Sequence, residues 1–157
     1  MKTADLIDKH AAELKLIHLP FRSFGAKHSF AGPAQTVKCF EDNTSIRAEL
    51  ETPGEGRVLV VDAGGSTRIA VMGDILAALA IRNNWVGVVI NGAIRDSAEI
   101  AMMDMLVFAL ATSPVKSAKH GFGKVGDIID IGGANVAPGM WVYADPDGVL
   151  VSQQKLA

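Results

Sequence analysis

The stretch that decides the fold of this chain covers residues 73–99 and reads GDILAALAIRNNWVGVVINGAIRDSAE. Apolar residues recur at helical spacing from Ile75 to Ile81, and a short β-branched run from Trp85 to Ile90 follows and ends in an Asn-Gly turn. The pattern predicts a loop, a helix, a strand and a second loop. A helix of about ten residues that returns antiparallel to its strand brings the two loops close together.

Three ionisable side chains stand at the two ends of this unit. Asp74 begins the helix, and Arg95 and Asp96 follow the strand. A guanidinium binds a carboxylate through two parallel hydrogen bonds, and the N–H groups of a first helical turn form a further anion site. A carboxylate such as Asp96 can hold Mg²⁺ or Mn²⁺, which prefer oxygen ligands and keep several waters when few carboxylates are supplied. We therefore expect a site for a small carboxylate and a divalent metal here.

Each of these residues also has a structural interpretation. Arg95 can form a salt bridge, Asp74 can cap its own helix, and Asp96 can cap a second helix that begins at Ser97. Glu99 can assist a metal or an attacking water, or it can simply face solvent. These alternatives remain open at the level of the sequence.

Length and composition limit the class of protein. The chain has 157 residues, 49% of them hydrophobic and 20% charged, which suits a single domain over residues 1–157 and favours an oligomer. Its formal net charge is −2, with no run of like charges, so we expect no direct binding to nucleic acid. The charged N-terminus and the absence of a membrane-spanning apolar run predict a cytoplasmic protein without a membrane partner.

The rest of the chain alternates a few helices with many short strands. Helices are expected at residues 4–17, from 43 or 44 to about 53, and at 97–104. Strands are expected at residues 35–40, 57–62, 106–111, 127–131, 141–144 and 149–152, the last two joined by a turn at 145–148. This order predicts an α/β fold with a compact β-rich core of two packed sheets and flanking helices.

Other residues give weaker signals. The Gly-rich turn at residues 63–66 lacks the spacing of a nucleotide-binding loop, and the single Cys39 is expected to be a buried structural thiol. The four histidines lack the spacing of zinc ligands. Lysines in a polar loop are poor candidates for a Schiff base, because nothing there suggests desolvation. They are Lys116, Lys119 and Lys124.

Several segments together resemble the RraA-like family, which includes regulators of ribonuclease activity A and class II 4-hydroxy-4-methyl-2-oxoglutarate (HMG) aldolases. They are FGAKHSFAGPAQTVKCFEDN (24–43), VLVVDAGGSTR (58–68), Gly73-Asp74, NNWVGVVINGAIRD (83–96) and YADPDGVLVS (143–152). The resemblance implies a swivelling β/β/α fold, a homotrimer, and an active site in a cleft between neighbouring subunits.

The resemblance also implies roles for residues. Gly73, Asp74, Ile75 and Leu76 match the backbone loop that holds a pyruvate carboxylate, Arg95 matches the substrate-binding arginine, and Asp96 matches the metal-binding carboxylate. Regulators of the family can lack the first Asp of this D-x20-R-D pattern, so the complete pattern here favours an enzyme. The family's old name as a methyltransferase finds no support, because the chain has no Rossmann-type glycine loop.

The resulting hypothesis is a lyase that uses a divalent cation (Mg²⁺ or Mn²⁺) to cleave HMG into two pyruvates and to decarboxylate oxaloacetate through a shared pyruvate enolate. The alternative is a non-catalytic regulator that binds and inhibits ribonuclease E. Longer aldolases of the family carry a C-terminal extension with an acidic residue, and this sequence ends at Ala157. The candidates for a general base are Asp74, Glu99 and His120, none of them marked by a motif. We therefore expect oxaloacetate decarboxylation, which needs no base, to be at least comparable to HMG cleavage.

Overall fold

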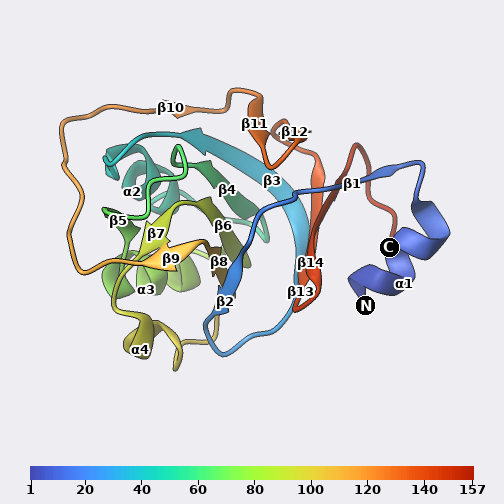
Figure 1. The fold of residues 1–157 in the computed structure, drawn as a ribbon, viewed down its shortest axis with the longest axis horizontal. Coiled ribbons are helices and arrows are strands. Elements are labelled where there is room, and N and C mark those ends of the chain that lie inside the picture. Colours follow the sequence, from blue (N-terminus) through green and yellow to red (C-terminus); the bar gives the residue numbers. More distant parts are fainter.

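The computed structural model describes all of residues 1–157 and is dominated by a mixed nine-stranded sheet (Figure 1). Its strands run in the order β1-β14-β13-β3-β4-β6-β8-β2, and β10 pairs with β3 beside this path. The strands are β1 (Leu14–Leu16), β2 (Arg22–Phe24), β3 (Phe30–Lys38), β4 (Val58–Asp62), β6 (Gly87–Asn91), β8 (Val107–Ala109), β10 (Lys124–Val125), β13 (Trp141–Asp145) and β14 (Gly148–Ser152).

Two small sheets and four helices complete the fold. One small sheet is parallel and consists of β5 (Ala70–Met72), β7 (Ala93–Ile94) and β9 (Ala111–Thr112); the other is the hairpin of β11 (Ile129–Ile131) and β12 (Ala134–Val136). The helices are α1 (Thr3–His10), α2 (Thr44–Leu50), α3 (Asp74–Arg82) and α4 (Ser97–Ile100). None of them is long and apolar enough to cross a lipid bilayer.

The long strand β3 joins two halves of the large sheet. Its first residues, 30–33, pair antiparallel with β13, and its last residues, 34–38, pair parallel with β4. Side chains from both halves meet in one hydrophobic cluster, which contains Val60 of β4 and Val142 of β13. The predicted α/β class is therefore confirmed, and the two expected sheets are halves of one sheet that share β3.

Strands β4 and β6 form the centre of the parallel half and are buried on both faces. Alternate residues of β4 contact different clusters: Leu59 faces α2 and α3, whereas Val60 faces the β13–β14 side. This explains their continuous apolar sequences, which are typical of covered parallel strands. Cys39 lies just beyond β3 and is 7% exposed, which confirms the expected buried thiol.

The N-terminal prediction was wrong in part. The first helix ends at His10 and not at residue 17, because Leu14–Leu16 forms β1 and pairs antiparallel with β14. Backbone pairing with an existing sheet edge overrides helical spacing in so short a segment. Helix α4 likewise ends at Ile100, the expected strand 35–40 belongs to the longer β3, and the expected strand 106–111 divides into β8 and β9. Strands β5, β7, β10 and β12 were missed.

The two ends of the chain lie together beside α1, on the side of the molecule away from α3 (Figure 1). Near the C-terminus, the Leu156 N–H donates to the Tyr143 hydroxyl at 2.7 Å. Near the N-terminus, Thr3 donates its N–H and its hydroxyl to the carboxylate of Asp145 at 2.7 and 2.6 Å. Both ends are thus attached to β13.

Candidate active site

Two neighbouring parallel strands bring the predicted site residues together. Strands β5 and β7 pair in parallel, and the Arg95 N–H donates to the Met72 carbonyl at 2.9 Å. Gly73 and Asp74 follow β5, while Arg95 and Asp96 follow β7, so both pairs leave the same edge of the small sheet. The proximity predicted from the sequence is confirmed, although parallel pairing of β5 and β7 produces it.

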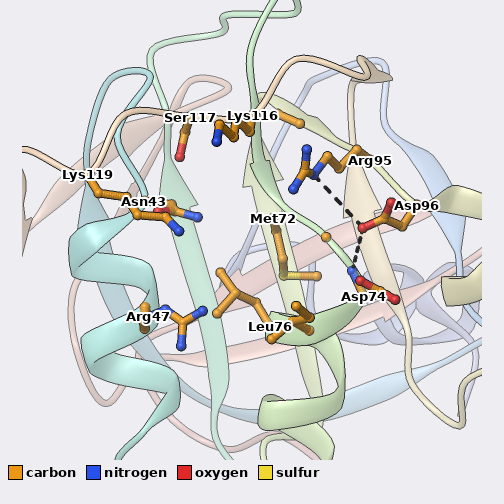
Figure 2. Close-up of a pocket in the computed structure, with 13 residues that line it drawn as sticks. Asn43, Arg47, Met72, Asp74, Leu76, Arg95, Asp96, Lys116, Ser117 and Lys119 are labelled. Atoms are coloured by element: carbon orange, nitrogen blue, oxygen red, sulfur yellow. Dashed lines mark hydrogen bonds and ion pairs between the residues drawn. The ribbon is translucent and has the colours of Figure 1, made fainter.

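The carboxylate of Asp96 lies at the centre of this arrangement (Figure 2). The Asp74 N–H donates to Asp96 Oδ2 at 3.1 Å, and Arg95 Nε lies 4.0 Å from the same oxygen. Asp96 has a left-handed backbone with φ of 56° and makes no capping hydrogen bond to α4, although it occupies the N-cap position. Its side chain thus faces Asp74, and the interpretation of Asp96 as a helix cap does not hold.

The start of α3 approaches Asp96 closely because position 73 is glycine. A Cβ on Gly73 would lie 2.5 Å from Asp96 Oδ2 and 3.3 Å from the Arg95 side chain. Gly73 also occupies the N-cap position, so Asp74 is the first residue of the helix and not its cap. The first N–H groups of a helix lack intrahelical partners, and here they point toward the same edge.

A small open cavity of about 90 Å³ lies in front of these groups. It is far smaller than the several hundred cubic ångströms typical of drug-sized or nucleotide ligands, so it suits a small acid. All the predicted binding residues line it, namely Gly73, Asp74, Ile75, Leu76, Arg95 and Asp96. Ile75 is 68% exposed at the rim, which leaves its backbone as the part able to contribute.

The opposite wall of the cavity was missed from the sequence. It consists of Asn43 just before α2, Arg47 on α2, and three residues of the loop after β9, namely Lys116, Ser117 and Lys119. These residues lie far from residues 73–99 in the chain and show no local pattern. Two sequence signals could have linked some of them: Asn43 and Arg47 are one helical turn apart, and Lys116 and Lys119 share the polar loop considered above.

Only some of the residues that the sequence offered as a Schiff-base lysine or a general base lie at the cavity. Lys116 and Lys119 reach the cavity but are solvent-exposed, which does not fit a desolvated Schiff-base lysine, and Lys124 lies outside on β10. Neither Glu99 nor His120 lines the cavity. Of the three candidate bases, only Asp74 is part of the site.

The donor set suits a hard divalent cation bound mainly by water and ligand. A hydrogen bond with Asp96, together with burial, raises the pKa of the Asp74 carboxyl. Two carboxylates this close repel each other, and a proton or a cation between them relieves that repulsion. No group of three or more His, Cys, Asp and Glu side chains converges anywhere in the chain. A cation here would keep several non-protein ligands, as Mg²⁺ commonly does.

Comparison with known proteins gives the family. The sequence model of the RraA-like family, described as Aldolase/RraA, matches residues 3–151. The chain belongs to the RraA-like family. Among its relatives, a protein of Aromatoleum aromaticum with the provisional name HMG aldolase is 48% identical over 155 residues, which cover 99% of this chain and 98% of the relative. One of Alkalilimnicola ehrlichii with the same provisional name is 49% identical over 98% of this chain and 96% of its own.

Solved structures of the RraA-like family share the whole fold. A Geobacillus kaustophilus protein, titled a 2-dimethylmenaquinone methyltransferase, superposes with a TM-score of 0.97 at 50% identity and covers 99% of this chain and 97% of its own. The RNA-processing inhibitor RraA of a Thermus species superposes with a TM-score of 0.96 at 41% identity, covering 100% and 95%. Proteins with this one fold thus carry the names of an aldolase, a methyltransferase and an inhibitor of RNA processing. The residues of the site are needed to choose between these functions.

Proposed function

We propose that this protein is a divalent-metal-dependent lyase of small 2-oxo acids, with HMG aldolase and oxaloacetate decarboxylase activities. The observation that carries the proposal is the convergence of Asp74, Arg95 and Asp96 on one small cavity beside a helix N-terminus. The provisional names of relatives at 48–49% identity agree with it. A methyltransferase function has less support, because the chain has no Rossmann-type glycine loop for S-adenosylmethionine.

The residues of the chain divide the chemistry between them. The Arg95 guanidinium holds the substrate's 1-carboxylate beside the start of α3, where the Asp74 N–H already donates to Asp96. Asp96, with Asp74 beside it, would hold Mg²⁺ or Mn²⁺, which when bound stabilises negative charge on the 2-oxo oxygen. In HMG cleavage a base removes the 4-hydroxyl proton, the C3–C4 bond breaks, and the electron pair forms the pyruvate enolate. We assign Asp74 as the carboxylate that receives that proton, directly or through water.

Decarboxylation of oxaloacetate reaches the same enolate without a base, because loss of CO₂ itself supplies the electron pair. A well-placed base is typically worth about 10²- to 10⁴-fold, and only Asp74 is available in this chain. We therefore expect oxaloacetate to be consumed at a rate at least comparable to that of HMG.

The test is a panel of 2-oxo acids with and without Mg²⁺, with pyruvate release coupled to lactate dehydrogenase. Both reactions should require the cation and stop on addition of EDTA. Much faster cleavage of HMG would reveal a strong base outside the described site. Absence of both reactions would refute the lyase.

A second candidate function is inhibition of ribonuclease E by direct binding. The observation that favours it is the close superposition on the RNA-processing inhibitor RraA. Such a role needs a surface and not the Asp74-Arg95-Asp96 site, so substitutions in the cavity would leave it intact. A pulldown with ribonuclease E tests it. We further propose that the protein is cytoplasmic and forms a homotrimer, the latter as the family resemblance implies. Light scattering tests the homotrimer, and cell fractionation tests the location.

A further inference from the structure

The cavity contains more positive charge than the binding of one substrate carboxylate by Arg95 requires. Four cationic side chains line it, Arg47, Arg95, Lys116 and Lys119, against the two carboxyl groups of Asp74 and Asp96. A divalent cation would add two further positive charges. Arg95 is sufficient for one substrate carboxylate, so a monocarboxylic acid would leave the opposite wall unneutralised.

Arg47 is the one guanidinium of that wall. It extends from α2 toward the cavity, across from Arg95 and Asp96 (Figure 2). Its one ion pair is a long contact of 3.8 Å with Glu51, and its side chain is 42% exposed. The guanidinium is therefore available to a ligand, and its planar fork suits a carboxylate.

Hydrogen bonds make this wall a fixed part of the structure. The buried Asp42 carboxylate accepts from the Thr44 N–H at 2.9 Å and from the His120 N–H at 2.7 Å. The Ala118 N–H donates to the Glu41 carbonyl at 3.0 Å. These bonds attach the loop that carries Lys116 and Lys119 to the start of the helix that carries Arg47.

We infer that Arg47 binds the distal carboxylate of the substrate and thereby selects dicarboxylic over monocarboxylic 2-oxo acids. The inference rests on the proposed function for the orientation of the ligand, with its 2-oxo acid end at Arg95 and Asp96. In this assignment Arg47 is a specificity residue, and Lys116 and Lys119 add favourable charge around it.

The test compares two ligands of equal chain length that cannot undergo the retro-aldol reaction, 2-oxoglutarate and 2-oxopentanoate, which differ only in the distal carboxylate. Isothermal titration calorimetry with Mg²⁺ present should give at least tenfold tighter binding of 2-oxoglutarate to the wild type. Arg47→Gln should remove most of that preference by weakening 2-oxoglutarate alone, and Arg47→Lys should retain part of it. Arg82→Gln, at the end of α3 and outside the cavity, is the matched control and should bind both ligands as the wild type does.

Equal affinity of the wild type for the two ligands, or no binding of either, would overturn the inference without any variant. So would an Arg47→Gln variant that weakens both ligands equally. Because the calorimetry measures binding and no turnover, its result is independent of the turnover assay that tests the proposed lyase function. Arg47-dependent binding in a protein that cleaves no 2-oxo acid would refute the proposed function and keep the inference.

Discussion

At the scale of single residues, the backbone of Asp96 determines what its side chain can do. Its φ of 56° lies in the left-handed region, where Asp and Asn are tolerated better than most residues. This conformation places Oδ2 within 3.1 Å of the Asp74 N–H.

Asp96→Asn should therefore keep the fold and lose the cation. Asparagine has the same size and accepts the left-handed backbone, but it lacks the charge that a divalent ion requires. We expect at least a tenfold loss of Mg²⁺ affinity by calorimetry, together with loss of Mg²⁺-stimulated turnover. Asp104→Asn, an exposed carboxylate near Lys27, is the control. Retained Mg²⁺ stimulation in Asp96→Asn would place the ion elsewhere.

Arg95→Lys should lose most activity although the charge is kept. An ammonium group cannot form the two parallel hydrogen bonds of a guanidinium with a carboxylate. We expect kcat/KM to fall roughly 30-fold, or about 2 kcal/mol, the range of a charge-assisted hydrogen bond left unmade. Arg82→Lys serves as the control. Near-wild-type kinetics of Arg95→Lys would remove Arg95 from the site.

At the scale of elements, the junction of β5 and α3 requires a residue without a side chain. A Cβ at position 73 would displace the flexible end of Asp96 and not the backbone. Gly73→Ala should thus leave the melting temperature within a few degrees of the wild type while lowering Mg²⁺ affinity and kcat/KM at least tenfold. Ala78→Ser, on the exposed face of α3, is the control. Unchanged Mg²⁺ affinity would show that the Asp96 carboxylate has another productive position.

The attachment of α1 to β13 should depend on pH. Burial opposes ionisation of Asp145, but hydrogen bonds from Thr3 and from the turn after β13 outweigh it and lower the pKa of this carboxyl. Its contribution to stability is therefore complete above the unfolded pKa of about 3.9 and is lost as the pH falls through the lower folded pKa.

Asp145→Asn should lower the free energy of unfolding by about 1.5–3 kcal/mol at pH 7, the usual value of hydrogen bonds to a charged group. Urea unfolding should show this difference shrinking below about pH 4. Asp147→Asn, in the same turn, should have little effect at either pH. A difference that persists undiminished at pH 2 would mean that packing, and not the carboxylate charge, attaches α1.

Elements with a strong local pattern could be predicted, and those that depend on distant pairing could not. Residues 73–99 alternate helix and strand over a short span, so these local elements could be predicted, whereas the parallel pairing of β5 and β7 that brings Asp74 close to Arg95 could not. Leu14–Leu16 has spacing that fits a helix as well as a strand, and only its pairing with β14 decides the matter. For the same reason only one wall of the cavity could be predicted. The residues of that wall lie within residues 73–99, whereas α2 and residues 116–119 approach them only in the folded chain.

At the scale of the whole molecule, the single thiol reports on global unfolding. Burial, with the negative charges of Asp42 and Asp62, raises the pKa of Cys39 to about 12. The reactive thiolate is thus scarce in the folded protein. A disulfide reagent at pH 8 should label Cys39 only as fast as the molecule unfolds, with the rate rising in urea together with the loss of circular dichroism. Fast labelling without denaturant would reveal local opening at the end of β3.

The shared position of the chain ends has a practical consequence. Both ends are attached to β13, whereas the cavity lies between α2 and the start of α3. An affinity tag, a fusion partner or a covalent link to a sensor chip can be placed at either end while the mouth of the cavity still faces the flowing solution. The same arrangement suits a circular permutant, in which a short linker joins residue 157 to residue 1 and new ends open elsewhere in the chain.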